Sequence, residues 1–361
     1  MTKPALHILS LPHTQVDENY VSCAYTQKAR KLALMMQKLG YEVYVYGSED
    51  FDKDIENGVT VITKEEQHNF FGDNDHTKHF YNITWGPDEA HWVHFNTRSI
   101  EEISKRIKPR DMILHFAGVC QKQVGDAFPD HFTVEAGIGY TGVYSKYRVY
   151  ESYAWQNYIH GEAHNDNGEF YETVIPNYWD PSEFPFNERG DYFLYIGRLI
   201  DRKGYKIAQE VCEKLGKRLI LAGQMSPNQQ FEGYGEYIGT VGVEERGELM
   251  SKAIAVFTPT TYLGPFEGTH VEAQLAGAPV ITTPFGVYNE TVSDSFNGMR
   301  CYTFQDFIDA VAWSESLTEH DRKQIRKRAQ SKWSMDVVAQ QYDNYFKRLQ
   351  DLYGRGWYTL K

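Results

Sequence analysis

The segment from Leu263 to Pro284, LGPFEGTHVEAQLAGAPVITTP, restricts what this chain can fold into more than any other. Its Pro-Phe-Glu-Gly loop leads into a helix expected to start near His270 and to end at Gly277, and a buried strand, PVITT, follows. A loop, a short helix and an apolar strand in this order are typical of a parallel sheet covered by helices. The segment therefore predicts an α/β fold.

The same segment is suited to binding a phosphate group. The backbone N–H groups at a helix N-terminus attract anions, so Gly268 and Thr269 are candidate donor-binding residues. Glu272, in the first turn of the helix, is expected to reach hydroxyl groups of the molecule that carries the phosphate. These features favour a nucleotide-sugar site, while a plain strand-to-helix joint is the alternative.

A second segment, Asp191 to Gly204, reads DYFLYIGRLIDRKG and supports the first. An apolar strand is followed by Gly197 and Arg198, then by Lys203, and a helix is expected from Tyr205 to Leu215. Arginine offers a planar fork to phosphate oxygens and lysine a mobile point charge. Two loops suited to phosphate in one sheet indicate a binding site, although an arginine and a lysine on one loop are often only solvated.

Apolar strands alternate with helical segments through both halves of the 361 residues, which suits two domains of roughly 150–180 residues each. We expect an α/β protein with two Rossmann-like parallel-sheet domains, at residues 1–180 and 181–335, and a terminal helix at residues 336–361. The polar stretch 48–89 is interpreted as strands and loops. The turn-rich segment 177–189 is the expected boundary.

Composition excludes several other classes of protein. No apolar run approaches the ~20 residues that span a bilayer, and the N-terminal ALHILSL is interpreted as a first strand rather than a signal peptide. The four cysteines lie far apart in the sequence and are expected to be buried thiols of a cytoplasmic protein. A formal net charge of −12 disfavours a broad nucleic-acid footprint.

The N-terminal half contains weaker candidates for the acceptor or sugar side of a site. Tyr25 and Thr26 lie on the loop between the first strand and the first helix, where open α/β sheets bind ligands. Gly139 and Tyr140 belong to the glycine-rich GIGYTG, a plausible ligand wall or a flexible turn. The segment 144–150, YSKYRVY, is interpreted either as a helix face packed at a domain interface or as a ligand-stacking patch.

The two basic residues of that last segment, Lys146 and Arg148, complete the acceptor-side candidates. Three histidines of the same half, His94, His115 and His131, could each supply a polar contact. Each histidine is more simply explained as a structural or surface residue.

GRLIDRKG and PFEG…VEAQLAGAPVITT resemble the retaining glycosyltransferases of the GT-B fold, specifically family four, also called group 1. The resemblance covers about residues 174–290. It implies two domains facing a central cleft, a terminal helix that crosses back to the first domain, and a nucleotide-sugar donor, expected to be UDP-linked. It also implies hexosyl or pentosyl transfer with no metal and no cofactor.

The resemblance suggests a role for each candidate residue. Arg198 and Lys203 are expected to neutralise charge on the leaving phosphate, and Glu272 to contact the ribose. Thr240, in IGTVG, is expected to lie beside the base. The family usually has a glutamate eight residues before Glu272 that contacts the sugar, but this chain has glycine at position 264.

Glu267 is expected to substitute for the glutamate that the family has at position 264. Family members usually have glycine at position 267. Glu267 is therefore placed with Arg198 and Lys203 among the expected catalytic residues. Its shifted position leaves the identity of the sugar open.

The acceptor is left open by the sequence: a small molecule, a glycan, a protein and modified DNA all fit. One alternative function is therefore a DNA-modifying glycosyltransferase of the viral kind that acts on hydroxymethylated bases. Another is a non-catalytic protein of the same fold that binds nucleotide-sugars or glycans, and its support is the glycine at position 264.

Overall fold

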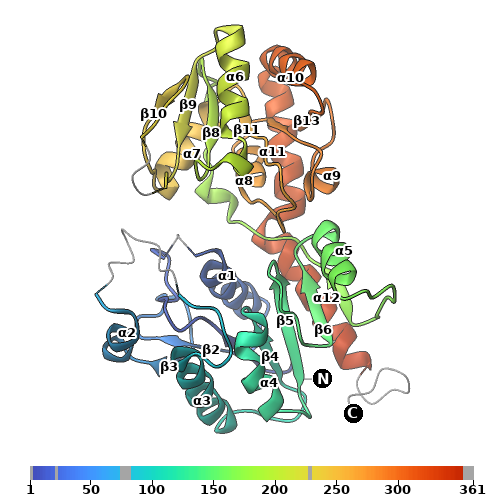
Figure 1. The fold of residues 1–361 in the computed structure, drawn as a ribbon. Coiled ribbons are helices and arrows are strands. Elements are labelled where there is room, and N and C mark those ends of the chain that lie inside the picture. The colour runs from blue at the N-terminus through green and yellow to red at the C-terminus, as the bar shows by residue number, and fades with distance from the viewer. Residues whose placement is uncertain (1–2, 21–22, 74–82, 227–229, 353–361) are drawn as a thin grey trace. The chain divides into compact units, whose positions relative to one another are not determined.

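The computed structural model describes residues 3–20, 23–73, 83–226 and 230–352, which divide into two compact units (Figure 1). The first unit contains the chain up to residue 151, residues 156–178 and the chain from residue 338 onward. The second unit contains residues 152–155 and 179–337. The terminal helix thus returns to the first unit, as expected.

The first unit is built on a seven-stranded parallel sheet in the order β3-β2-β1-β4-β5-β6-β7. The strands are β1 (Leu6–Leu9), β2 (Val43–Ser48), β3 (Gly58–Ile62), β4 (Met112–His115), β5 (Phe132–Ile138), β6 (Tyr147–Tyr150) and β7 (Glu172–Val174). Every residue of β1 and β4 is buried, because central strands of a parallel sheet are covered on both faces.

Helices α1, α3 and α4 pack against this sheet, and α12 ends in the same unit. The helical segments are α1 (Ala24–Lys38), α2 (Lys64–Phe71), α3 (Ala90–Ser104), the 3-10 turn η1 (Gly118–Gln121), α4 (Lys122–Ala127), α5 (Tyr153–Glu162) and α12 (Met335–Leu352). The first turn of α5 and the first three residues of α12 belong to the second unit.

Helix α2 corrects the interpretation of the polar stretch 48–89 as strands and loops only. Thr63 accepts a hydrogen bond from the backbone N–H of Glu66, and the Glu66 carboxylate accepts one from the backbone N–H of Thr63. This reciprocal capping box starts the helix although its residues are mostly polar. The Thr-x-x-Glu spacing was the signal in the sequence that could have predicted it.

The segment YSKYRVY is also corrected, because it forms a strand rather than a helix face. Tyr147–Tyr150 pair in parallel with β5 and β7 as strand β6, and Tyr147 and Tyr150 are buried. Tyrosine and valine fit the pleated, half-buried surface of a sheet, and that preference decides the local structure here.

The second unit is built on a six-stranded parallel sheet in the order β10-β9-β8-β11-β12-β13. Its strands are β8 (Phe193–Ile196), β9 (Leu219–Ala222), β10 (Glu236–Tyr237), β11 (Val256–Thr258), β12 (Val280–Thr282) and β13 (Gly298–Arg300). Its helical segments are η2 (Pro181–Glu183), η3 (Asp201–Lys203), α6 (Tyr205–Leu215), α7 (Val243–Lys252), α8 (Thr269–Leu275), α9 (Tyr288–Thr291), α10 (Phe304–Ser316) and α11 (Glu319–Trp333).

Successive residues of the central strands point to opposite faces of this sheet, and each face has its own core. Phe193 and Phe257 join residues of α6 and α10 in one cluster, whereas Leu194 and Val256 join residues of α7, α8 and α11 in the other. The sheet is therefore covered on both sides, as Figure 1 shows.

Three buried histidines are expected to make stability depend on pH. Burial lowers the pKa of His13 and of His115 to about 3 and that of His270 to about 4, from an ordinary value of 6.5. Below pH 6.5 the unfolded chain binds protons at these groups and the folded chain does not, so stability falls as pH is lowered towards 4. Each group contributes up to ~1.4 kcal/mol per pH unit.

Urea unfolding at pH 7.5 and at pH 5 measures this loss. His115→Gln removes one of the three titrating groups, and we expect the loss between the two pH values to become smaller in that variant. An unchanged loss would contradict the assignment to His115.

Candidate nucleotide-sugar site

The candidate site lies where the strand order of the second sheet reverses. Numbered along the chain, the six strands follow the order 3-2-1-4-5-6, with the reversal between β8 and β11. Ligands of open α/β sheets bind at the carboxyl ends of the strands at such a point. The loop after β8 carries Arg198 and Lys203, and the loop after β11 carries Glu267.

Backbone contacts hold these two loops together. The backbone N–H of Thr261 donates to the carbonyl of Arg202 over 2.9 Å. Gly204 has φ +75°, and a Cβ at this position would overlap the carbonyl oxygen of Pro259. The close approach is possible because glycine has no side chain. Lys203 is thereby brought beside the loop after β11.

We expect Gly204→Ala to destabilise the protein more than Gly216→Ala. Both glycines flank α6 and have left-handed φ values, of +75° and +61°, but no atom lies within 4 Å of a Cβ built on Gly216. Gly216→Ala should cost ~1–2 kcal/mol from the backbone alone, and Gly204→Ala a further ~1–3 kcal/mol from overpacking. Equal decreases in the free energy of unfolding, measured with urea, would show that the contact with Pro259 does not affect stability.

Glu267 is held in place by two side chains. Its carboxylate forms an ion pair with Lys203 and accepts a hydrogen bond from the Tyr262 hydroxyl over 2.6 Å. Burial and then the Glu267 carboxylate raise the pKa of Tyr262, so its phenol keeps the proton that it donates. The Tyr262 ring also contacts the cationic groups of Arg202 and Lys203, at 4.4 Å and 5.1 Å from its centre.

Gly264 lies directly beside that carboxylate. A Cβ at residue 264 would overlap Glu267 Oε1 and Cδ. The carboxylate of Glu267 thus fills the space into which a side chain at position 264 would extend. Glu267 itself has φ +61°, a left-handed conformation that residues other than glycine seldom adopt.

Arg198 is the exposed member of the group. Within the described ranges its guanidinium makes no hydrogen bond or ion pair. Its backbone carbonyl accepts from the Tyr195 hydroxyl at 2.9 Å and from the Ile200 N–H at 3.0 Å. Gly197 and Thr240 follow β8 and β10 at the same edge of the sheet, and Thr240 is exposed. Arg198 is therefore a cation available to a ligand at the carboxyl edge of the sheet, where Gly197 and Thr240 also lie.

Glu272 is buried in α8 and already has two partners. Trp179 Nε1 donates to Glu272 Oε1 over 3.1 Å, and Arg246 Nε lies 3.4 Å from Oε2. The Trp179 ring also packs against Gly268, where a Cβ would lie 3.0 Å from the ring. Thr269 is the first residue of α8.

Sequence reasoning missed Tyr262, Trp179 and Arg246 as parts of this site. Trp179 lies in the turn-rich segment 177–189 that was expected to form the domain boundary, and this was the available signal. No local pattern marks Arg246, whose partner Glu272 lies 26 residues away in the sequence. None marks Tyr262 either, although Glu267 follows it by only five residues on the same loop.

On the first unit the structure gathers three of the six acceptor-side candidates. The Tyr25 hydroxyl donates to the carbonyl of Gly139 over 2.9 Å, and the Tyr25 ring meets that of Tyr140 edge-on at 5.8 Å. A Cβ at Gly139 would overlap the Glu151 carboxylate, which is paired with Lys28. Glycine at position 139 therefore makes room for a buried ion pair.

The other three candidates are not brought into that group. The Thr26 hydroxyl is buried and donates to Thr14 over 2.7 Å. Arg148 binds the Glu172 carboxylate at 3.0 Å from within β6. Lys146 is exposed on the loop that precedes β6.

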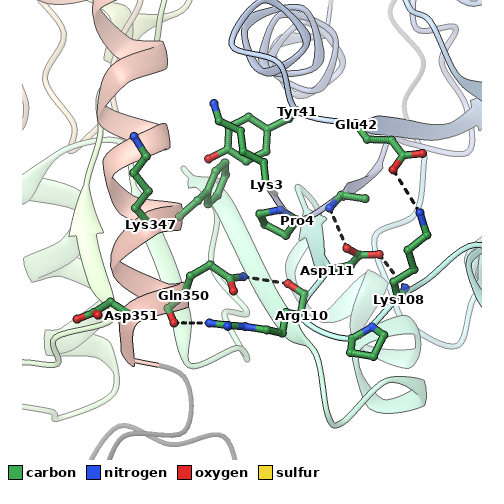
Figure 2. A pocket seen from close by; sticks show the side chains of 13 residues that line it. Lys3, Pro4, Tyr41, Glu42, Lys108, Arg110, Asp111, Lys347, Gln350 and Asp351 are labelled. Carbon is green, nitrogen blue, oxygen red and sulfur yellow. Dashed lines mark hydrogen bonds and ion pairs between the residues drawn. The ribbon is translucent and has the colours of Figure 1, made fainter. Parts of the chain in front are cut away.

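A cavity of about 1050 Å³ opens at the amino-terminal edge of the first sheet, opposite the carboxyl edge that carries Gly139 and Tyr140 (Figure 2). Its basic side chains have partners: Lys108 lies 3.5 Å from Glu42, and Arg110 donates to the carbonyl of Gln350 over 2.6 Å. This cavity contains none of the candidate site residues.

No helix among the described residues is both long and apolar enough to cross a membrane. In the same ranges, no group of three histidine, cysteine or acidic side chains is arranged to hold a metal ion. Independence from metal stays a prediction.

Comparison with known proteins assigns the second unit to a family. Residues 180–332 match the family described as glycosyl transferases group 1. The second unit is a group 1 glycosyltransferase domain. The resemblance seen in GRLIDRKG and in PFEG…VEAQLAGAPVITT is thereby confirmed. All candidate donor-side residues belong to this group 1 domain.

An uncharacterized glycosyltransferase of Methanocaldococcus jannaschii is 24% identical over 182 residues, 45% of this chain and 46% of that protein. The chain thus matches less than half of that relative's length. Among solved structures, sucrose-phosphate synthase from Thermosynechococcus elongatus has a TM-score of 0.68 at 14% identity, covering 97% of this chain and 100% of the other.

HepE of Anabaena, solved with UDP and glucose, has a TM-score of 0.67 at 13% identity, over 95% of this chain and 99% of the other. Identities this low show the fold alone. The chain that contains the group 1 domain has the GT-B fold, with two parallel-sheet α/β domains.

Proposed function

We propose that this protein is a metal-independent glycosyltransferase that moves a hexose or pentose from a nucleotide-sugar to a hydroxyl group and retains the anomeric configuration. One observation carries the proposal: Lys203 and Glu267, 64 residues apart in the sequence, form an ion pair at the strand-order reversal of the group 1 domain, and exposed Arg198 lies on the same loop as Lys203. A cation pair beside a carboxylate suits a sugar bound to a diphosphate.

In the proposed reaction the bond between the anomeric carbon and the diphosphate oxygen breaks, and its electron pair leaves with the diphosphate. Arg198 and Lys203 neutralise the charge that grows there, and each such donor commonly contributes ~3–4 kcal/mol. The acceptor oxygen bonds to the same carbon on the face that the diphosphate leaves, and its proton passes to the diphosphate. No enzyme nucleophile is required.

Glu267 is the proposed contact for the sugar hydroxyls. Its carboxylate fills the space into which a side chain at position 264 would extend. This supports the proposal that Glu267 substitutes for the glutamate expected at position 264 from the family resemblance. In the proposed complex Glu272 contacts the ribose, and Gly268 and Thr269 contact phosphate. Thr240 lies beside the base.

UDP is the proposed nucleotide. HepE, a protein of the same fold, was solved in complex with UDP-glucose, and this supports UDP as the first nucleotide to test. The acceptor is a hydroxyl compound that Tyr25, Gly139 and Tyr140 could contact on the first unit. The DNA-modifying alternative is weakened because Arg148, one of the two basic residues of YSKYRVY, is already paired with Glu172 and is not available for a DNA phosphate.

Thermal unfolding with UDP, GDP, ADP and CMP and their sugar conjugates tests the donor. A ligand that binds only the folded state raises the melting temperature, by the equivalent of ~2.7 kcal/mol at one hundred times Kd. We expect UDP and one UDP-sugar to raise it and the UDP-sugar to be hydrolysed slowly. Binding without any hydrolysis would instead favour a non-catalytic nucleotide-sugar-binding protein.

A further inference from the structure

Glu267 has an unusual backbone conformation in addition to its paired carboxylate. Its φ of +61° is one of five positive values at residues other than glycine in the described part of the chain. A side chain in this region crowds its own backbone, so the conformation persists only where surrounding contacts impose it. At Glu267 the left-handed turn aims the carboxylate at Lys203, Tyr262 and the space beside Gly264.

His270 contacts the backbone of Glu267 directly. His270 Nδ1 lies 2.5 Å from the backbone carbonyl oxygen of Glu267, three residues earlier. A carbonyl only accepts, so Nδ1 carries the proton and donates. The backbone N–H of His270 also points at that carbonyl, at 3.4 Å. One residue therefore offers two donors to the carbonyl of the strained residue.

The imidazole is locked in this orientation. His270 is fully buried, and its ring packs against Phe266, Tyr288 and Trp333 at centre distances of 5.7, 5.2 and 6.3 Å. Nε2 has no hydrogen-bond partner among the described residues, so Nδ1 makes the single polar contact of the ring. Burial lowers the pKa of His270 to about 4, which keeps the ring uncharged.

We infer that His270 is a positioning residue: by donating from Nδ1 to the Glu267 carbonyl it holds the left-handed turn that aims the Glu267 carboxylate at the sugar. The inference rests on the proposed role of Glu267. His270 lies beneath the loop and touches no substrate itself. Its loss should weaken recognition of the sugar and spare recognition of the nucleotide, to which Arg198 and Lys203 are assigned.

Binding of UDP and of UDP-glucose, measured by calorimetry, separates these effects. In His270→Leu we expect Kd for UDP-glucose to rise about tenfold, because the variant loses one hydrogen bond that positions Glu267. Kd for UDP should stay within about twofold. His270→Asn, which keeps a donor near Nδ1, should restore most of the difference. On a Glu267→Ala background, His270→Leu should have no further effect on sugar binding.

Equal losses for UDP and UDP-glucose, or the same loss on the Glu267→Ala background, would overturn the inference and leave His270 a packing residue. If the unaltered protein binds neither ligand, the assignment of UDP as the nucleotide fails, and unfolding measurements test the role of His270 instead. Glycine adopts a left-handed turn without help, so His270→Leu should lower the urea midpoint less in Glu267→Gly than in the unaltered protein. Additive midpoint shifts would contradict the positioning role.

Discussion

Lys203→Ala is expected to lower donor hydrolysis and sugar transfer about 10²–10³-fold, the usual effect of removing one group that stabilises transition-state charge. The variant should also leave the Glu267 carboxylate with Tyr262 as its remaining partner. The Lys203 side chain is only 19% exposed, but it lies on a loop after β8 rather than in a core cluster. We therefore expect the fold to survive.

The matched control is Lys206→Ala, three residues further on. Lys206 is 58% exposed and pairs with Asp201 on the surface, so its loss should change activity less than twofold. Initial rates of UDP-sugar hydrolysis and circular dichroism would be measured for both variants. Full activity in Lys203→Ala would remove the phosphate role from that residue.

Gly264→Ala is expected to lower turnover by displacing Glu267, the partner of Lys203. The new methyl group would overlap the Glu267 carboxylate and push it away from Lys203 and Tyr262. The backbone at residue 264 is not left-handed, so alanine adds no strain of its own. We expect turnover to fall about 10²-fold, since misplacement of a group by about 1 Å is known to have such an effect.

Gly242→Ala is the control for the glycine substitution. Gly242 has φ −74°, and no atom lies within 4 Å of a Cβ built there, so activity should be unchanged. Combining Gly264→Ala with Glu267→Gly removes the overlap together with the carboxylate. We expect the double variant to stay as inactive as Gly264→Ala, because the carboxylate is lost in both. Recovery of full activity in the double variant would show that the Glu267 carboxylate has no role in turnover.

The sequence alone was sufficient for what depends on neighbours along the chain. Helix α6 runs from Tyr205 to Leu215 as predicted, because Gly204 and Gly216 flank an apolar pattern of helical period. The loops that carry Arg198 and Glu267 were predicted for the same reason, and they identified the family. Helix α2 was missed where polar composition outweighed a capping signal.

Tertiary structure decided what depends on residues distant in the sequence. Lys203 meets Glu267 across 64 residues because parallel strands β8 and β11 end at one edge of the sheet. The contact between Gly264 and the carboxylate of Glu267 is local in sequence, but it depends on a left-handed backbone at Glu267 that no residue pattern predicts. Periodicity and capping are local signals, whereas shared space and hydrogen bonding to distant residues exist only after the chain has folded.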